Sequence, residues 1–291
     1  MHFNSVLAVS DFSALSAHAL ERAALLARQH QITLRLVHLD EGPAIHPLDP
    51  IARLGQRARQ LARRHEISVH AIERSAPLDA VLAEAGDSSL LVMGPMLQRS
   101  WRKFHRGTTL DQAVHGTLCP LLVVKQEPHR SYRHVLVAVD LSARTKPLID
   151  FASRFSTPTA LRLFHAIDTI EDSKLRSVQV SAEAIQANRF NSRQHAKDRL
   201  AQLIGARHLA PAGSKDPPLT FEVGNGDPAY TTALHQLSSQ AELVVVGKRR
   251  SSPLAQFFTG SVAQRLAKWA AGDVLIAPFD QLGVVTRVDR L

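Results

Sequence analysis

Two glycine-containing loops carry residues that could hold a phosphate group. In the second half of the chain, Gly247 is followed thirteen residues later by Gly260-Ser261, where an apolar helical pattern begins. The first half repeats this spacing with Gly94 and Gly107-Thr108. Ser or Thr at such a place predicts a helix N-cap, and the free amides of a helix start, together with the helix dipole, attract anions. The glycine before the cap would let the backbone approach the anion closely.

Charged side chains accompany both loops. Asp11 and Asp140 each follow a strand-like run and stand two residues before a serine. Each aspartate could contact a ligand, or it could simply cap the next helix. The second loop also contains Lys248, Arg249 and Arg250. Arginine pairs well with phosphate oxygens, but the triplet is equally consistent with an exposed, solvated loop.

Other patterns in the chain do not predict catalysis or metal binding. Gly224–Ala229, GNGDPA, loosely fits a dinucleotide fingerprint, but no acidic residue ends the following strand, so we interpret it as a turn that starts a helix. His65 and His70 are five residues apart and would not share a helix face as zinc ligands do. The repeated His38 and His165 are predicted to pack. The sequence has no P-loop and no GxSxG elbow, so no catalytic residue and no metal site is predicted.

The chain contains an internal repeat. Residues 5–26 match residues 134–155, which places Asp11 on Asp140. LLVMG matches LVVVG, so that Gly94 falls on Gly247, and the final runs CPLLVVK and GDVLIAP also agree. A repeat of this size predicts two copies of one folding unit.

Within each copy, short apolar runs alternate with helical patterns, which is typical of βαβ units and a parallel sheet covered on both faces. The predicted fold class is α/β, with two tandem five-stranded parallel-sheet α/β/α sandwiches. The domains are predicted at residues 1–127 and 132–291, and the second has a longer middle helical segment at 169–218. The predicted strands lie near residues 5–10, 33–39, 69–74, 89–93, 120–125, 134–139, 160–167, 219–224, 242–246 and 273–277.

Composition limits the class of protein. The 291 residues are 45% hydrophobic and 21% charged, which indicates a globular chain. The single cysteine rules out a disulfide framework, and a cytoplasmic protein is expected. The net charge of +9 permits an anionic partner. Part of that charge lies in the arginine-rich residues 51–66, where it could form a solvated face or a binding patch.

These residues together resemble the universal stress protein family. The shared features are a first strand followed by Asp-Phe-Ser or Asp-Leu-Ser, a second strand containing His, and a fourth strand ending in Gly with Gly-Thr or Gly-Ser thirteen residues later. The resemblance covers both copies and implies an adenine-nucleotide alpha-hydrolase-like, Rossmann-like fold. In the ATP-binding branch of this family the motif is Gly-x2-Gly-x9-Gly-Ser/Thr. Here Leu97 and Arg250 stand in place of its second glycine.

The resemblance implies a non-catalytic regulatory protein that responds to stress and binds ATP or another adenine nucleotide, with domain 2 favoured because Arg250 could replace the lost backbone contacts. The cofactor-binding residues it implies are Asp140, Gly247, Arg250, Gly260, Ser261, Asp11, Gly94, Gly107 and Thr108. Two alternatives stay open. One is a weak ATP-hydrolysing enzyme, and the other is a polyanion or nucleic-acid binder that uses the basic loops.

The fifth strands, LLVVK and VLIAP, are apolar, and an apolar edge strand left open would promote aggregation. We therefore predict that they pair and form an intramolecular pseudo-dimer of the two domains. A homodimer of two chains and unidentified protein partners remain options. No membrane association is predicted, because no apolar run is long enough to span a bilayer. Nucleic acid is not expected, because two Trp and two Tyr supply few stacking surfaces.

Overall fold

A computed structural model describes most of the chain. The described residues are 3–40, 49–87, 89–95, 107–155, 160–169, 181–208, 219–248 and 261–279. Domain 1 contains β1 Ser5–Ser10, α1 Ala14–His30, β2 Thr33–Leu39, α2 Pro50–His65, β3 Val69–Ala76, α3 Leu78–Ala85, β4 Ser89–Met93, α4 Thr109–Gly116 and β5 Leu121–Val123. Domain 2 contains β6 His134–Ala138, α5 Thr145–Phe155, β7 Ala160–Ile167, α7 Ala182–His208, β8 Leu219–Asn225, α8 Pro228–Ser238, β9 Leu243–Lys248, α9 Val262–Trp269 and β10 Asp273–Pro278.

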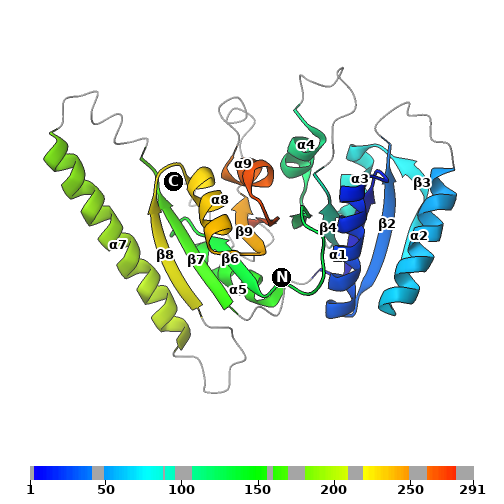
Figure 1. The fold of residues 1–291 in the computed structure, drawn as a ribbon, viewed down its shortest axis with the longest axis horizontal. Coiled ribbons are helices and arrows are strands. Elements are labelled where there is room, and N and C mark those ends of the chain that lie inside the picture. The colour runs from blue at the N-terminus through cyan, green and yellow to red at the C-terminus, as the bar shows by residue number, and fades with distance from the viewer. Residues whose placement is uncertain are drawn as a thin grey trace, which may run out of the picture.

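The strands form one continuous ten-stranded sheet in the order β3-β2-β1-β4-β5-β10-β9-β6-β7-β8 (Figure 1). Neighbouring strands are parallel within each domain, and β5 and β10 pair antiparallel through Leu122 and Leu275 at the centre. The predicted α/β class, the ten strand positions and the pairing of the fifth strands are confirmed. The carboxyl ends of the strands therefore lie at opposite edges of the sheet in the two domains.

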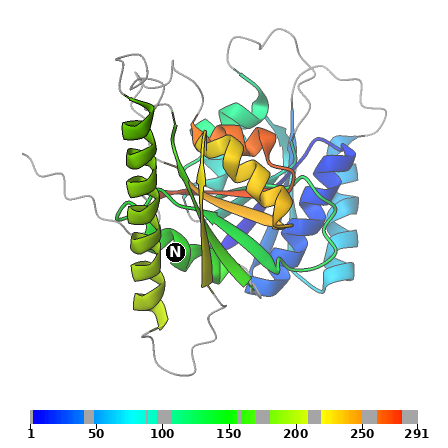
Figure 2. The same cartoon turned by 60° about the vertical axis from the view of Figure 1, so that its left-hand side comes forward.

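Helices cover both faces of the sheet, as the continuous apolar strands predict. Side chains that alternate along β1 belong to two different clusters: Val6 and Ala8 share one with residues of α1, α2, α5 and α7, whereas Leu7 and Val9 share the other with residues of α3, α4, α8 and α9. The long helix α7 lies along the outer strands of domain 2 (Figure 2). The middle segment that domain 2 adds is thus helical over its described part.

Side chains at the helix starts explain where several helices begin. Ser13 caps α1 by accepting from the amide of Ser16. Asp227 caps α8 with Pro228 in the first turn, and its carboxylate accepts from the amide of Tyr230 at 2.9 Å. This cap explains GNGDPA as a turn and helix start.

A buried carboxylate joins the two domains. Asp273, at the start of β10, accepts hydrogen bonds from the amides of Lys125 and Gln126 at 2.8 and 3.2 Å and from the hydroxyl of Tyr132. The Arg22 guanidinium of α1 lies 3.9 Å from the centre of the Tyr132 ring. Burial raises the pKa of Asp273. The cluster fixes the linker between the domains against the shared sheet.

Lysines also link the domains. Lys248, at the end of β9, donates to the carbonyl of His115 at the C-terminus of α4, at 2.6 Å. Lys125 of domain 1 donates to the carbonyl of Ala270 after α9, at 2.5 Å. Cations at helix C-termini satisfy carbonyls that lack helical partners and interact favourably with the dipole. Each domain thus stabilises the end of a helix in the other.

Candidate functional site

The loops after β1 and β6 share one geometry, as the repeat predicts. The Asp11 carboxylate accepts from the amide and hydroxyl of Ser13 at 2.9 and 2.6 Å. Asp140 accepts in the same way from Ser142 at 3.1 and 2.6 Å. The residue between them has a positive φ in both loops, 59° at Phe12 and 58° at Leu141. Two non-glycine residues in this conformation show that the turn is tightly determined in both domains.

The two aspartates differ in exposure. Asp11 is half-buried and Asp140 is exposed. Burial acts to raise the pKa of Asp11, but the hydrogen bonds from Ser13 outweigh it and the pKa lies below its usual value. Asp11 is therefore ionised at neutral pH. Both carboxylates accept hydrogen bonds from the serine two residues on, but only that of Asp140 lies at the surface, in domain 2.

Gly94 and Gly247 lie at the carboxyl ends of β4 and β9, as predicted, and each has a packing role. A Cβ on Gly94 would stand 3.0 Å from the backbone of Leu15 in α1. A Cβ on Gly247 would stand 2.0 Å from the Phe279 ring, which is buried there and has the Arg144 guanidinium 5.1 Å from its centre. Close packing therefore favours glycine at both positions without a ligand.

The N-terminus of α4 holds a carboxylate of its own chain. Gly107 has a φ of 76° and directs the chain into the helix. Thr108 caps the helix, and its amide and hydroxyl both donate to Asp111 Oδ2, at 3.0 and 2.7 Å. Lys268 of α9 contacts the other carboxylate oxygen at 2.7 Å. An anion that approached this helix start in domain 1 would meet a negative charge.

The N-terminus of α9 is similar but neutral. Ser261 caps the helix by accepting from the amide of Gln264 at 3.3 Å, and the Gln264 side-chain oxygen accepts from the Ser261 amide at 2.9 Å. This capping box uses an amide where α4 uses a carboxylate. Domain 2 therefore keeps the positive potential of a helix start without a compensating acid in the first turn.

Some predicted residues fall outside the described part of the chain. These are Arg250 and Gly260, together with Leu97 and Arg249. Lys248 is described, and the structure gives it the capping contact with α4 that the sequence did not suggest. His38 is buried and hydrogen-bonded to Ser75 at 2.8 Å, in keeping with its predicted packing role.

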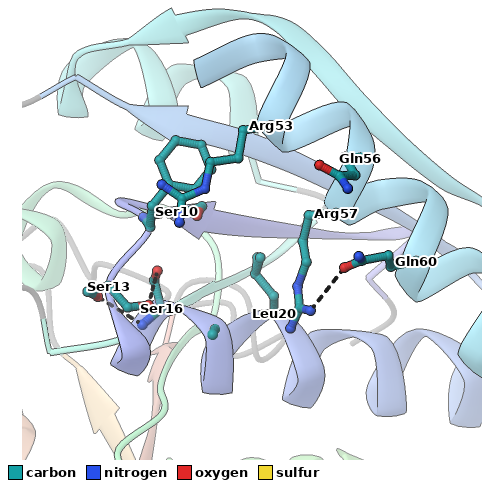
Figure 3. A pocket seen from close by; sticks show the side chains of 10 residues that line it. Ser10, Ser13, Ser16, Leu20, Arg53, Gln56, Arg57 and Gln60 are labelled. Atoms are coloured by element: carbon teal, nitrogen blue, oxygen red, sulfur yellow. Dashed lines mark hydrogen bonds between the residues drawn. The ribbon is translucent and has the colours of Figure 1, made fainter. Parts of the chain in front are cut away.

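A cavity between α1 and α2 was not anticipated from the sequence. It measures about 310 Å³ and is lined by Ser10, Phe12, Ser13, Ser16, Ala17, Leu20, Arg53, Gln56, Arg57 and Gln60 (Figure 3). The arginines of α2 were interpreted either as a solvated face or as a patch. The absence of any acid from residues 50–65 was the one sequence signal of a strongly basic helix there.

Two features are absent from the residues that the structure describes. No group of three or more His, Cys, Asp and Glu side chains among them is arranged to hold a metal ion. In the same residues, no helix combines the length and the hydropathy needed to cross a bilayer.

A known protein family matches each copy of the repeat separately. The sequence profile described as "Universal stress protein family" matches residues 2–125 and again 131–278. A universal stress protein of Mycobacterium tuberculosis is 27% identical over 222 residues, which cover 72% of this chain and 68% of that protein.

Solved structures show the same fold. A universal stress protein from Archaeoglobus fulgidus DSM 4304 superposes with a TM-score of 0.63 at 15% identity, covering 95% of this chain and 97% of the other. A functionally unknown protein from Pseudomonas aeruginosa PAO1 gives a TM-score of 0.62 at 19% identity, with 96% and 94% covered.

Proposed function

The chain belongs to the universal stress protein family, with two copies of the family's domain, and from this premise we propose that it is a non-catalytic regulatory protein whose second domain binds an adenine nucleotide. ATP with Mg²⁺ is the first candidate. The proposed site comprises Asp140, Gly247, Ser261 and the intervening Arg250 and Gly260 at the carboxyl edge of domain 2.

The observation that carries this proposal is the difference between the two helix starts. Gln264 at α9 is uncharged, and Asp111 at α4 is an anion held by Lys268. A phosphate group interacts favourably with the amides and dipole at the start of α9. At α4 the same phosphate would have to displace Asp111 from the Thr108 amide, against charge repulsion. Domain 2 is thus the better nucleotide site even though Phe279 covers Gly247.

Each remaining residue has a role in the proposal. The exposed Asp140 carboxylate would accept hydrogen bonds from ribose hydroxyls. Arg250 would pair with phosphate oxygens in place of the backbone contacts that a second glycine permits. Because Phe279 fills the space beside Gly247 on the α5 face, the nucleotide would contact the opposite side of that strand end.

Calorimetric titration of Mg-ATP into the full-length protein tests the proposal. Gln264→Glu keeps a capping box, since Glu at this position is a normal partner of Ser, but it adds a carboxylate where the phosphate would lie. We expect this change to weaken binding about tenfold or more. Gln186→Glu makes the same substitution on the exposed face of α7 and should leave the affinity unchanged. Equal affinity in all three proteins, or no binding to the wild type, would reject the nucleotide site.

Two further assays on the wild type and Gln264→Glu, phosphate release from ATP and nucleic-acid binding at several salt concentrations, separate the two alternative functions. An ATP-hydrolysing enzyme would release phosphate from the wild type faster than from Gln264→Glu. A polyanion binder would bind nucleic acid with an affinity that falls steeply as salt rises, whatever residue stands at position 264. A nucleotide-binding regulator shows neither behaviour.

A further inference from the structure

The cavity between α1 and α2 has the surroundings of a ligand site. Its volume of about 310 Å³ is at the lower end of the range, roughly 300–1,000 Å³, found for small-molecule pockets. Side chains from α1 and α2 enter it from opposite sides, and the loop after β1 closes one end (Figure 3). Ala17 and Leu20 provide an apolar wall, while serine hydroxyls and glutamine amides provide hydrogen-bonding groups.

The charge around the cavity is positive. No acidic residue of the described part of the chain lines it, and residues 50–65 contain five arginines and no acid. Two carboxylates lie next to lining residues: Asp11 accepts from Ser13 at 2.6 Å, and Glu21 is shared by Arg57 at 3.1 Å, Arg64 at 2.7 Å and His65 at 2.8 Å. Two carboxylates, Asp11 and Glu21, do not neutralise the three guanidinium groups of Arg53, Arg57 and Arg64, so the region keeps a surplus of positive charge that an anion would offset.

Arg53 is held in place beside the cavity. Its guanidinium lies 4.3 Å from the centre of the Phe12 ring, and that ring is stacked on His38 with 4.8 Å between centroids. Arg53 has no carboxylate partner within the described ranges. A guanidinium fixed by an aromatic ring and lacking an acid keeps its hydrogen-bond donors for a ligand.

We infer that this cavity binds a small, polar organic anion of the size of a three- to six-carbon phosphate monoester or dicarboxylate. Arg53 and Arg57 would bind the charged group, because guanidinium groups match carboxylate and phosphate oxygens in a bidentate geometry. Gln56 and Gln60 can each donate and accept, which suits the hydroxyl groups of the ligand body. The apolar wall limits the length of that body.

This site is separate from the proposed nucleotide site. The cavity lies between the α1 and α2 helices of domain 1, whereas Asp140 and Ser261 lie in domain 2. The inference therefore goes beyond the proposed function, and either can fail without the other. Gln264→Glu should weaken Mg-ATP binding and leave the anion site unchanged.

Calorimetric titration of the full-length protein with defined probes tests the inference. The probes are glycerol 3-phosphate, glucose 6-phosphate and succinate, with inorganic phosphate as the fragment that lacks an organic body. Arg53→Gln removes the guanidinium beside the cavity, and Ala17→Met fills the cavity from α1. The control Arg59→Gln removes the same charge from an exposed position on α2 outside the cavity lining.

We expect at least one organic probe to bind the wild type and Arg59→Gln equally, and to bind Arg53→Gln and Ala17→Met about tenfold or more weakly. Retained binding in Ala17→Met would overturn the inference, because the anion would then lie outside the cavity. Equal weakening of binding in Arg53→Gln and Arg59→Gln would also overturn the inference, because the loss would then be explained by the lower net charge of α2. The inference would also be overturned if none of the organic probes bound to the wild type.

Discussion

At the scale of single residues, Gly94 and Gly247 occupy equivalent positions of the repeat but pack against different neighbours. The backbone of α1 approaches Gly94, whereas an aromatic ring from after β10 approaches Gly247. The repeat made both glycines predictable as functional candidates. It could not show these neighbours, because Phe279 is far from Gly247 in sequence and only the closed sheet brings the two together.

Gly247→Ala should destabilise the protein by about 1–3 kcal/mol, because its Cβ would overlap the Phe279 ring in a closely packed site. Urea denaturation measures the change in the free energy of unfolding. The double variant Gly247→Ala, Phe279→Leu should recover part of the loss. Gly205→Ala, in the exposed and open surroundings of α7, should be neutral or stabilising by up to about 1 kcal/mol. Equal losses at both glycines would contradict this packing role.

Tyr132→Phe should also destabilise the protein, by about 1–3 kcal/mol, because it removes a hydroxyl donor from the buried Asp273 carboxylate. The other tyrosine, Tyr230, is exposed on α8, so Tyr230→Phe serves as the matched control and should change the free energy of unfolding little. Similar effects of the two substitutions, measured by denaturant unfolding, would show that the Asp273 cluster contributes no stability.

At the scale of elements, the apolar runs predicted all ten strands, because strands covered on both faces need apolar side chains at every position. The sequence patterns did not predict the cavity between α1 and α2, or the lysines of each domain that donate to the helix C-termini of the other. Those contacts depend on how helices pack, and no local pattern encodes that. The capping boxes at Thr108 and Ser261 were predictable as helix starts, but the opposite consequences of Asp111 and Gln264 became evident only from their hydrogen bonds.

The link between α4 and α9 should depend on pH. Burial acts to raise the pKa of Asp111, but hydrogen bonds from Lys268 and Thr108 outweigh it, and the pKa lies below its usual value. A carboxylate whose pKa is lower in the folded state than in the unfolded state stabilises the folded protein. This stabilisation is complete when the pH is above the unfolded-state pKa, and it is lost as the pH falls through the folded-state pKa.

Asp111→Asn should therefore lower the free energy of unfolding at pH 7, and the difference from the wild type should shrink as pH falls below about 4. Unfolding curves of both proteins between pH 7 and pH 3 measure this difference. Its disappearance in a Lys268→Met background would identify the ion pair as the main cause. A difference that stays constant over the whole range would contradict the assignment.

At the scale of the whole molecule, the domains share one sheet and the two hydrophobic clusters that cover its faces. Residues of both domains, such as Val6, Val135 and Leu275, belong to the same contiguous core. The apolar fifth strands predicted that the domains would pair. The antiparallel register and the Asp273 cluster that fixes the linker could not be predicted, because they depend on the geometry of the completed sheet.

We therefore expect the full-length protein to unfold in a single thermal transition. Differential scanning calorimetry should give a calorimetric enthalpy close to the van't Hoff enthalpy, as for one cooperative unit. Two resolved transitions would mean that the β5–β10 pairing and the Asp273 cluster couple the domains too weakly to unfold them together.

Hydrogen–deuterium exchange of the full-length protein with and without Mg-ATP tests the central claim most directly, since it locates the nucleotide on the chain. We predict that added nucleotide slows exchange at the start of α9, from Ser261 to Gln264, and leaves exchange at the start of α4, from Thr108 to Asp111, unchanged. Slower exchange at α4 alone, or no change at α9, would contradict the assignment of the nucleotide site to domain 2.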